Sequence, residues 1–416
     1  MEKRYNELDS LRGLAASTVV LGHLALLAFA VNAPPSWLRW RELVMLANRT
    51  PLTLLMSGGA AVRFFFVLSG FVLMLPFLRY KENPYFPYLV KRICRIYLPY
   101  LAAVAVALAG DCLLGHHPLS LFGGSLEPTW AKPTSWKLIV QHVVMLGRFD
   151  AQQFDTVLWS LVQEMRISIL YPLIALAVLK LRRWKLLALV IAIEAGVLAV
   201  PFFFPHADIS LVSYPMTLHF SCMFTLGAWL AMERERIREW MQRMSKPAKA
   251  WLAGVAFLMY SMGVKTLWGD QIQLHLVHRI EGIHTITRWA NVMFLGYFPI
   301  WVGDWVATIC AAIAICFALT DRRTKKVLNH KLVLLTGRAS YSLYLVHAIV
   351  LYTLLYLLWG THYFVLLLPG YFVFTILLTI VFYRWIEIPS MKLGRYLAKR
   401  MTAPVDSAKP LSAAAD

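Results

Sequence analysis

The chain has 416 residues, of which 59% are hydrophobic and only 15% are charged, and its mean hydropathy is +0.60. Soluble domains carry about a quarter charged residues, so the composition excludes an ordinary water-soluble protein. The formal net charge is +19, but the basic residues gather in short runs between apolar stretches. That arrangement is typical of membrane topology, and we do not expect nucleic-acid binding.

Apolar stretches recur along the chain at lengths that suit a lipid bilayer. A membrane-spanning helix needs about 20 predominantly apolar residues. The sequence predicts about ten such helices, at residues 13–31, 55–78, 97–114, 157–179, 186–204, 214–232, 250–264, 292–319, 333–358 and 364–386. We therefore expect an all-α polytopic protein that crosses the inner or plasma membrane many times.

The basic runs indicate how these helices are oriented. With the N-terminus in the cytoplasm, "KRICR", "LRRWK", "RERIREWMQR" and "DRRTKK" all fall on the cytoplasmic side, as the positive-inside rule requires. Both termini are then cytoplasmic, and the first helix serves as an uncleaved anchor. We expect residues 1–400 to form one integral membrane domain. Residues 401–416, rich in Ala, Pro and Ser, are predicted to be a disordered cytoplasmic tail.

The first apolar stretch, "LDSLRGLAASTVVLGH", combines an arginine and a histidine. His23 follows Arg12 by eleven positions, and at about 100° per residue both side chains return to one face of a helix, roughly 16 Å apart along its axis. The two residues therefore share one stripe of the first helix.

Later stretches place further arginines in or beside apolar segments. "AAVRFFFVLSGF" puts Arg63 in the outer half of the second predicted span. "LVKRICRIYLP" puts Arg92 and Arg95 three positions apart, on one helix face at the cytoplasmic surface. Paired guanidinium groups suit bidentate binding of phosphate.

Two more stretches carry polar groups inside predicted spans. "LWSLVQEMR" places Ser160 and Glu164 one helical turn apart, and "ASYSLYLVH" places His347 near the middle of the ninth span. Ionisable groups at the bilayer centre cost about 2.5–3.5 kcal/mol each on insertion scales, so they are functional hypotheses by default.

Other buried ionisable residues have a structural interpretation. Glu194 and His219 stand in otherwise plain apolar helices, and we expect interhelical hydrogen bonds for them. Asp304 lies in "VGDW", where we expect a helix break, and Glu387 is expected to pair with Arg384. The histidines of the 270s and 280s and the five cysteines lack metal-binding spacing, so we expect no metal or prosthetic group.

Taken together, these stretches resemble the membrane-bound acyltransferase family 3, whose members move acyl groups onto carbohydrates and some secondary metabolites. The opening stretch is similar to the family's Arg-x10-His signature. "FFFVLSGF", "KRICRIYLP", "LWSLVQE", "YSLYLVH" and "EIPSMK" follow in the family's order, over about residues 8 to 395. Two departures stand in the sequence: Ile167 and Ser168 replace an aromatic pair, and Ala61 replaces a glycine.

The resemblance implies an acyl-CoA donor on the cytoplasmic side and an acceptor hydroxyl often presented from the other side. It implies that His23 acts as the general base and that Glu164 orients or stabilises its imidazole, or binds the acceptor. On the same resemblance, we expect Arg63 to stabilise the oxyanion or to partner Glu164, and His347 to bind substrate or to cap an interhelical network. The residues expected to bind substrate are Arg12, Arg63, Arg92, Arg95, Ser160 and His347.

The function expected from this resemblance is O-acyl transfer, with acetyl as the acyl group, from acyl-CoA to a hydroxyl of a cell-envelope or exported glycan. A small-molecule acceptor such as a macrolide remains an alternative. A proton-coupled transporter is a second class, because about ten spans with buried charges also describe such carriers, although no paired half-length helices are apparent. No cofactor is expected beyond acyl-CoA as co-substrate.

Overall fold

The computed structural model describes residues 5–27, 35–48, 50–79, 84–115, 119, 129–204, 210–263 and 298–402, and every regular element in these ranges is helical. Its first half contains α1 (Asn6–Leu26), α2 (Pro35–Asn48), η2 (Pro51–Met56), α3 (Gly58–Arg79), α4 (Tyr85–Leu114), α5 (Trp136–Val144), α6 (Leu158–Lys180) and α7 (Arg183–Phe203). Its second half contains α8 (Tyr214–Met232), α9 (Arg234–Arg243), α10 (Lys246–Gly263), α13 (Phe298–Thr320), α14 (Arg322–Leu328), α15 (Lys331–Arg338), α16 (Ser340–Leu358), η4 (His362–Leu366), α17 (Leu367–Phe382), η5 (Tyr383–Glu387) and α18 (Ile388–Thr402).

Seven helices in these ranges are long and apolar enough to cross a bilayer: Gly58–Arg79, Tyr85–Leu114, Leu158–Lys180, Arg183–Pro201, Ile300–Thr320, Ser340–Leu358 and His362–Thr402. The other three predicted spans fall on α1, α8 and α10, which are helical as expected. The all-α, polytopic class is therefore confirmed. Of the predicted tail, residues 403–416 lie outside the described residues, as do His275, His278 and His284.

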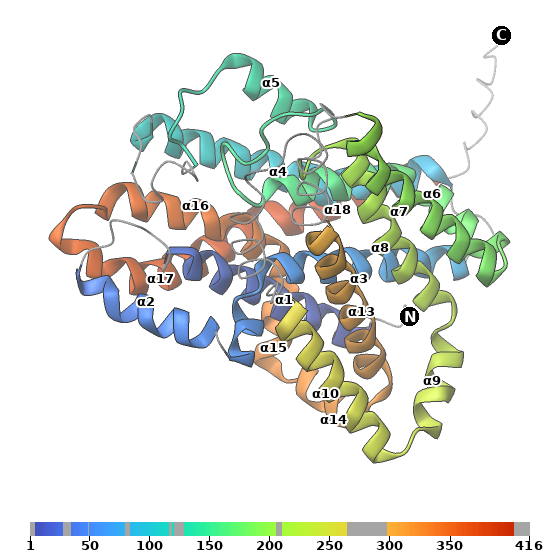
Figure 1. Ribbon diagram of the computed structural model, residues 1–416. Coiled ribbons are helices and arrows are strands. Elements are labelled where there is room, and N and C mark those ends of the chain that lie inside the picture. The colour runs from blue at the N-terminus through green and yellow to red at the C-terminus, as the bar shows by residue number, and fades with distance from the viewer. Residues whose placement is uncertain are drawn as a thin grey trace, which may run out of the picture.

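Helix α1 lies at the centre of the helix assembly, where it packs against α3, α15 and α16 (Figure 1). Helices α16 and α17 flank it on one side, and α3, α8 and α13 lie on the other. Because α1 carries Arg12 and His23, this central place puts both residues among side chains from several distant parts of the chain.

Helices α3 and α8 approach each other closely at two glycines. A Cβ atom on Gly70 would lie 2.1 Å from the carbonyl oxygen of Phe224, and one on Gly227 would lie 1.9 Å from the carbonyl oxygen of Val67. Small residues allow this backbone-to-backbone approach in membrane helices. The "SGF" of the sequence therefore marks a packing contact.

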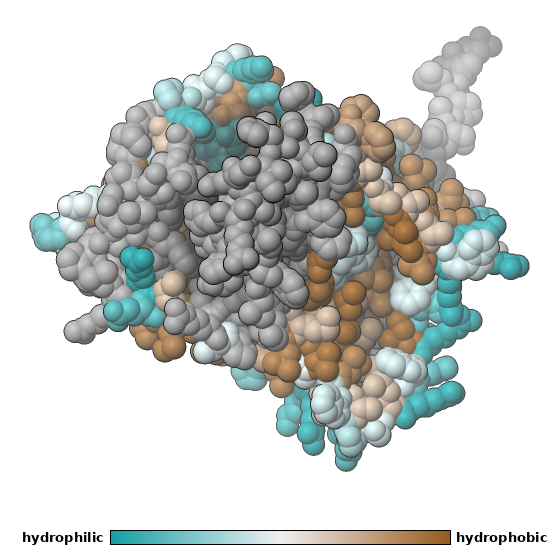
Figure 2. Space-filling model, viewed as in Figure 1, coloured by the Kyte–Doolittle hydropathy of each residue, from teal (hydrophilic) through white to brown (hydrophobic). Residues whose placement is uncertain are grey.

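The outer surface is divided by polarity. On the face in Figure 2, apolar side chains cover α7, α8 and α13, whereas hydrophilic side chains gather on α9. Helix α9 has the sequence RERIREWMQR. This division suits an apolar flank in hydrocarbon and a basic helix at the membrane–water boundary.

Two local expectations were wrong. Asp304 lies within the continuous helix α13, so "VGDW" does not break the helix. Glu387 does not pair with Arg384 in the described contacts: its Oε2 accepts hydrogen bonds from the amide and hydroxyl of Ser342, at 3.2 and 2.5 Å. Glu387 ends the π-helical turn η5, which turns its carboxylate toward the start of α16.

Candidate active site

Two histidines from opposite ends of the chain meet inside the helix assembly. Nε2 of His347 lies 3.2 Å from Nδ1 of His23, and the ring centroids are 5.0 Å apart. His347 is fully buried in α16, and His23 is partly buried in α1. The sequence marked each histidine as a mid-span residue, but nothing in their spacing paired them.

The neighbouring carbonyls fix the proton positions of this pair. Nδ1 of His347 lies 3.1 Å from the carbonyl oxygen of Leu343, so this nitrogen carries the hydrogen and donates it. Nε2 of His347 is then an acceptor for Nδ1–H of His23, which also approaches the carbonyl oxygen of Val19 at 3.1 Å. These tautomers are assigned from the hydrogen-bond network. They leave Nε2 of His23 as an unprotonated, basic nitrogen.

A threonine hydroxyl is the partner of that basic nitrogen. Oγ1 of Thr156 lies 3.2 Å from Nε2 of His23 and donates its hydrogen to it. Thr156 stands two residues before α6, in the segment that follows α5. No motif in the sequence singled out Thr156, because its role depends on a contact between residues far apart in the chain.

Ser160 lies on the first turn of α6, beside the histidine pair. Its hydroxyl lies 2.6 Å from the hydroxyl of Tyr344 and donates to the carbonyl oxygen of Val157 at 3.0 Å. The Tyr344 ring in turn packs near His347, with centroids 6.0 Å apart. Ser160 and Tyr344 therefore form a pair of hydroxyls next to His347.

Glu164 is engaged away from His23. Its Oε1 lies 2.7 Å from a terminal nitrogen of Arg92 and accepts a 3.3 Å hydrogen bond from Ser69. Ser168, one turn later on α6, accepts two further hydrogen bonds from Arg92, at 3.1 and 3.0 Å. The described contacts of His23 are with Val19, Thr156 and His347, so these residues orient the imidazole and Glu164 does not.

Arg12 lies near Arg92 and Arg95, the two arginines that are predicted to bind phosphate. Arg12 interacts electrostatically with both Arg95 and Arg92, and its terminal nitrogen lies 3.2 Å from Asp9. Arg95 makes no ion pair within the described residues, and its nearest polar contact is the sulfur of Met391 at 4.0 Å. Among the described residues, Arg95 is therefore the arginine of this group whose guanidinium makes no direct ion pair.

Arg63 belongs to a separate buried network. Its Nε lies 2.6 Å from Oδ1 of Asp304 in α13. Oδ2 of Asp304 lies 3.3 Å from His219, whose other ring nitrogen lies 2.9 Å from Glu194. Trp301 donates to the same Glu194 at 2.6 Å. The expected interhelical hydrogen bond of Glu194 and His219 is confirmed, and Arg63 partners Asp304 instead of Glu164.

The guanidinium of Arg63 also packs over aromatic rings. It lies 5.8 Å from the ring of Trp159 and 5.6 Å from the ring of Phe220. Such cation–π contacts are worth about 0.5–2 kcal/mol each. Trp159 directly precedes Ser160, so Arg63 stabilises the first turn of α6 where it faces the histidine pair.

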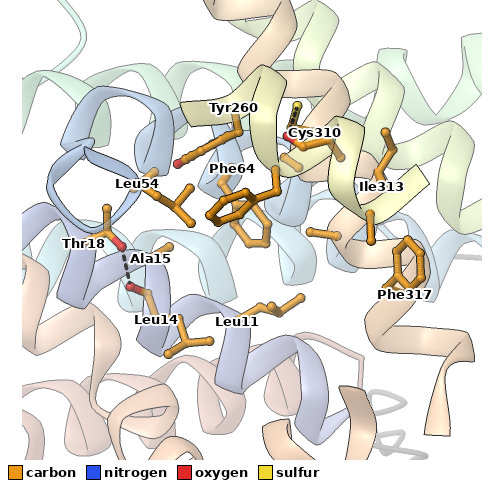
Figure 3. Close-up of a pocket in the computed structure, with 16 residues that line it drawn as sticks. Leu11, Leu14, Ala15, Thr18, Leu54, Phe64, Tyr260, Cys310, Ile313 and Phe317 are labelled. Carbon is orange, nitrogen blue, oxygen red and sulfur yellow. Dashed lines mark hydrogen bonds between the residues drawn. The ribbon is translucent and has the colours of Figure 1, made fainter. Parts of the chain in front are cut away.

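An apolar cavity of about 320 Å³ lies beside α1, between α3, η2, α10 and α13 (Figure 3). None of the described residues that line it carries a charged side chain. Two of its polar groups are satisfied within the wall, since Thr18 donates to the carbonyl oxygen of Leu14 at 3.1 Å and Cys310 to that of Ala256 at 3.3 Å. On α1 this face is turned by roughly 100–140° from the Arg12–His23 stripe. The cavity suits hydrocarbon groups and is separate from the histidine pair.

Within the described ranges, no group of three His, Cys, Asp or Glu side chains is arranged to hold a metal ion. The groups that surround the histidine pair are hydroxyls and backbone carbonyls. This arrangement can hold and move protons at oxygen and nitrogen atoms, which is the chemistry of acyl transfer to a hydroxyl.

Comparison with known proteins gives the class of this protein. The family model of the acyltransferase domain, acyltransferase family 3, matches residues 5–384. The chain belongs to this family, and it is a multi-pass membrane acyltransferase. The resemblance of the sequence motifs to this family is thereby confirmed.

One curated relative is similar over nearly the whole chain. Nodulation protein 10 of Rhizobium leguminosarum bv. viciae is 24% identical over 417 residues, covering 95% of each chain. No solved structure matches the chain.

Proposed function

We propose that the protein is an O-acyltransferase of the inner or plasma membrane, with ten spans and cytoplasmic termini. It moves an acetyl group from cytoplasmic acyl-CoA to a hydroxyl of a cell-envelope or exported glycan, without a further cofactor. The observation that carries this proposal is the basic Nε2 of His23, which faces a hydroxyl at 3.2 Å. Membership of the acyltransferase family argues against the transporter alternative.

His23 acts as the general base in this proposal. The acceptor hydroxyl takes the place of the Thr156 hydroxyl at Nε2 and gives its proton to the imidazole, while its oxygen attacks the thioester carbonyl carbon. The tetrahedral intermediate collapses with cleavage of the C–S bond, and the imidazolium returns the proton to the departing thiolate. The products are the ester and free CoA thiol.

His347 is a positioning residue for His23. Its Nε2 accepts the Nδ1–H of His23 at 3.2 Å, which keeps the lone pair of His23 on Nε2. The same contact stabilises the imidazolium, because Nδ1–H is a stronger donor when the ring is charged.

The negative charge on the intermediate's oxygen needs hydrogen-bond donors. The paired hydroxyls of Ser160 and Tyr344 lie beside His347 and are suited to that role. Arg63 has less support as the oxyanion donor, because its guanidinium is paired with Asp304.

The donor approaches along the stripe of α1. Arg12, Arg92 and Arg95 supply the positive charge that attracts the phosphates of acyl-CoA. Glu164 and Ser168 hold Arg92 in place, so Arg95 is the arginine that is free to bind a phosphate directly. The acyl-pantetheine arm then spans the roughly 16 Å between Arg12 and His23.

Transfer by the full chain in lipid nanodiscs tests the proposal. Radiolabelled acetyl-CoA is supplied with isolated envelope glycans, and labelled glycan ester is counted beside released CoA. We expect His23→Ala and His23→Gln to lower kcat by about 10²–10⁴-fold without raising the KM for acetyl-CoA. Gln keeps a hydrogen bond but cannot accept the proton, so a substantially active Gln variant would overturn the role of His23 as base.

A further inference from the structure

Asp155 is a buried carboxyl group that the chemistry proposed above does not use. It precedes Thr156 directly, and it is 0% exposed. Its Oδ1 accepts the amide hydrogen of Val157 at 3.2 Å, and its backbone oxygen accepts that of Leu158, also at 3.2 Å. Its Oδ2 is buried and has no hydrogen-bond partner in the described part of the chain. One oxygen of the group is therefore available to a ligand.

The surroundings of Asp155 are hydroxyl groups rather than cations. It interacts electrostatically with Tyr100 of α4, with Tyr344 and Tyr352 of α16, and with Tyr371 of α17. No Lys or Arg of the described ranges forms an ion pair with it. Burial without a cation raises the pKa of Asp155 to about 8.

Two histidines contact the residues on either side of Asp155 in the chain. From α1, His23 reaches the adjacent Thr156 through its Nε2. From α5, His142 packs on the ring of Phe154, with centroids 4.5 Å apart, and burial lowers the pKa of this histidine to about 4. Since both histidines are neutral in the assigned state, neither supplies a positive charge that would draw the proton off Asp155.

A neutral carboxyl group can both donate and accept a hydrogen bond, which matches the properties of an alcohol. The hydroxyl of Tyr100, which is also 0% exposed, likewise has no partner among the described residues. Burying such groups unpaired costs about 1–3 kcal/mol each. A polar ligand that brings hydroxyls to this place would remove that cost.

We propose that Asp155 forms an acceptor subsite, in which its free carboxyl oxygen binds the hydroxyl next to the one that His23 deprotonates. Thr156 and Asp155 are consecutive, so the subsite lies one residue from the position of the reacting oxygen at Nε2 of His23. The protein then selects vicinal diols over isolated alcohols. This inference rests on the proposed O-acyl transfer.

Two small alcohols that differ by one hydroxyl test the subsite. The full chain in nanodiscs is given acetyl-CoA with cis-1,2-cyclohexanediol or with cyclohexanol, and kcat/KM is measured for each. We expect the wild-type protein to prefer the diol by about 5–10-fold, the worth of one good hydrogen bond. Asp155→Ala should bring the ratio of the two kcat/KM values down to about two, the statistical advantage of having two hydroxyls, mainly through a higher KM for the diol.

A matched control and a pH series separate this role from a structural one. Asp150→Asn removes an exposed carboxylate of the same segment and should leave the ratio unchanged. In the wild-type protein the diol preference should decline above about pH 8, where Asp155 loses its donor hydrogen. Asp155→Asn keeps a donor and an acceptor at every pH, so the diol preference of this variant should not decline. If Asp155→Ala fails to fold, the comparison of wild-type protein with Asp155→Asn decides whether Asp155 binds the second hydroxyl.

The outcomes also distinguish the two proposals. If Asp155→Ala lowers transfer to both alcohols equally, or keeps the wild-type ratio, the subsite is overturned while O-acyl transfer stands. If wild-type protein transfers acetyl to neither alcohol nor to glycan, the proposed function is overturned and the subsite with it.

Discussion

Nε2 of His347 accepts a hydrogen bond from Nδ1 of His23 across 3.2 Å, although 324 positions separate the two residues in the chain. This contact decides which nitrogen of His23 is basic. The chemistry at the centre of the protein therefore depends on both α1 and α16, and a change in either helix should alter it.

Replacement of His347 tests this dependence. His347→Leu removes the acceptor for Nδ1–H of His23, so we expect kcat to fall by about 10–100-fold, less than for loss of the base itself. The KM for acyl-CoA should stay the same. His347→Gln offers a side-chain oxygen as acceptor and should recover part of the loss. Equal activity of the wild-type, Leu and Gln proteins would show that His347 only fills space.

Arg92 and Arg95 should respond differently to replacement, contrary to the symmetrical expectation from the sequence. Arg95→Ala removes a guanidinium without an ion pair in the described residues, and it should raise the KM for acyl-CoA while the protein stays stable. Arg92→Ala leaves the partly buried Glu164 without its cation, which should destabilise the protein, by less than the roughly 3–5 kcal/mol typical of a fully buried broken pair.

Thermal unfolding in nanodiscs measures this difference. The double variant Arg92→Met with Glu164→Gln should be more stable than Arg92→Ala, because no uncompensated charge remains. An Arg92→Ala protein as stable as Arg95→Ala would contradict the role of the Arg92–Glu164 pair in holding α4 against α6.

The pair formed by Arg63 and Asp304 should show strong energetic coupling. Arg63→Met and Asp304→Asn should each destabilise the protein, by about 3–5 kcal/mol where a charge is left unpaired. Combined, they should cost less than the sum of the two, with a coupling energy within about 0.5–3 kcal/mol in a double-mutant cycle. Additive losses would mean that the 2.6 Å contact between them contributes nothing.

Asp155 should make stability fall as the pH rises. Its folded pKa of about 8 lies above the ordinary value of 3.8 for an aspartate, so between these two pH values the folded chain holds a proton that the unfolded chain releases. The contribution of Asp155 to the free energy of unfolding is therefore fully present below about pH 4 and is lost as the pH rises toward 8. Asp155→Asn does not titrate, so its Tm should exceed that of the wild-type protein by several degrees at pH 7.5 and by little at pH 4.5. A constant difference between the two proteins would show that Asp155 is ionised when folded.

The sequence allowed the helices and the individual polar residues to be predicted, because apolar length and a 3.6-residue period are local properties. It also predicted that Glu194 and His219 form interhelical hydrogen bonds, which the structure confirms. Helical periodicity shows which side chains share a face of one helix, but it does not show which other helix that face meets. The pairing of Arg63 with Asp304, 241 positions away, therefore had no signal in the sequence.

Thr156 and Ser168 show two further reasons why contacts in the site could not be predicted from the sequence. Thr156 lies in an irregular segment, where no period predicts the direction of a side chain. Ser168 stood out only as a departure from the family's aromatic pair, and its two hydrogen bonds to Arg92 became apparent when α4 and α6 were seen together. A departure from a family pattern was in this case a sign of a specific contact.

The glycine contact between α3 and α8 sets the distances within the buried network of Arg63, Asp304 and His219. Arg63 belongs to α3 and His219 to α8, and Asp304 bridges them. A methyl group at Gly70 or Gly227 would meet a carbonyl oxygen at about 2 Å, so the two helices would have to separate by at least about 1 Å. The bridge from Arg63 to His219 would then be stretched beyond hydrogen-bonding length, although neither glycine touches a charged group.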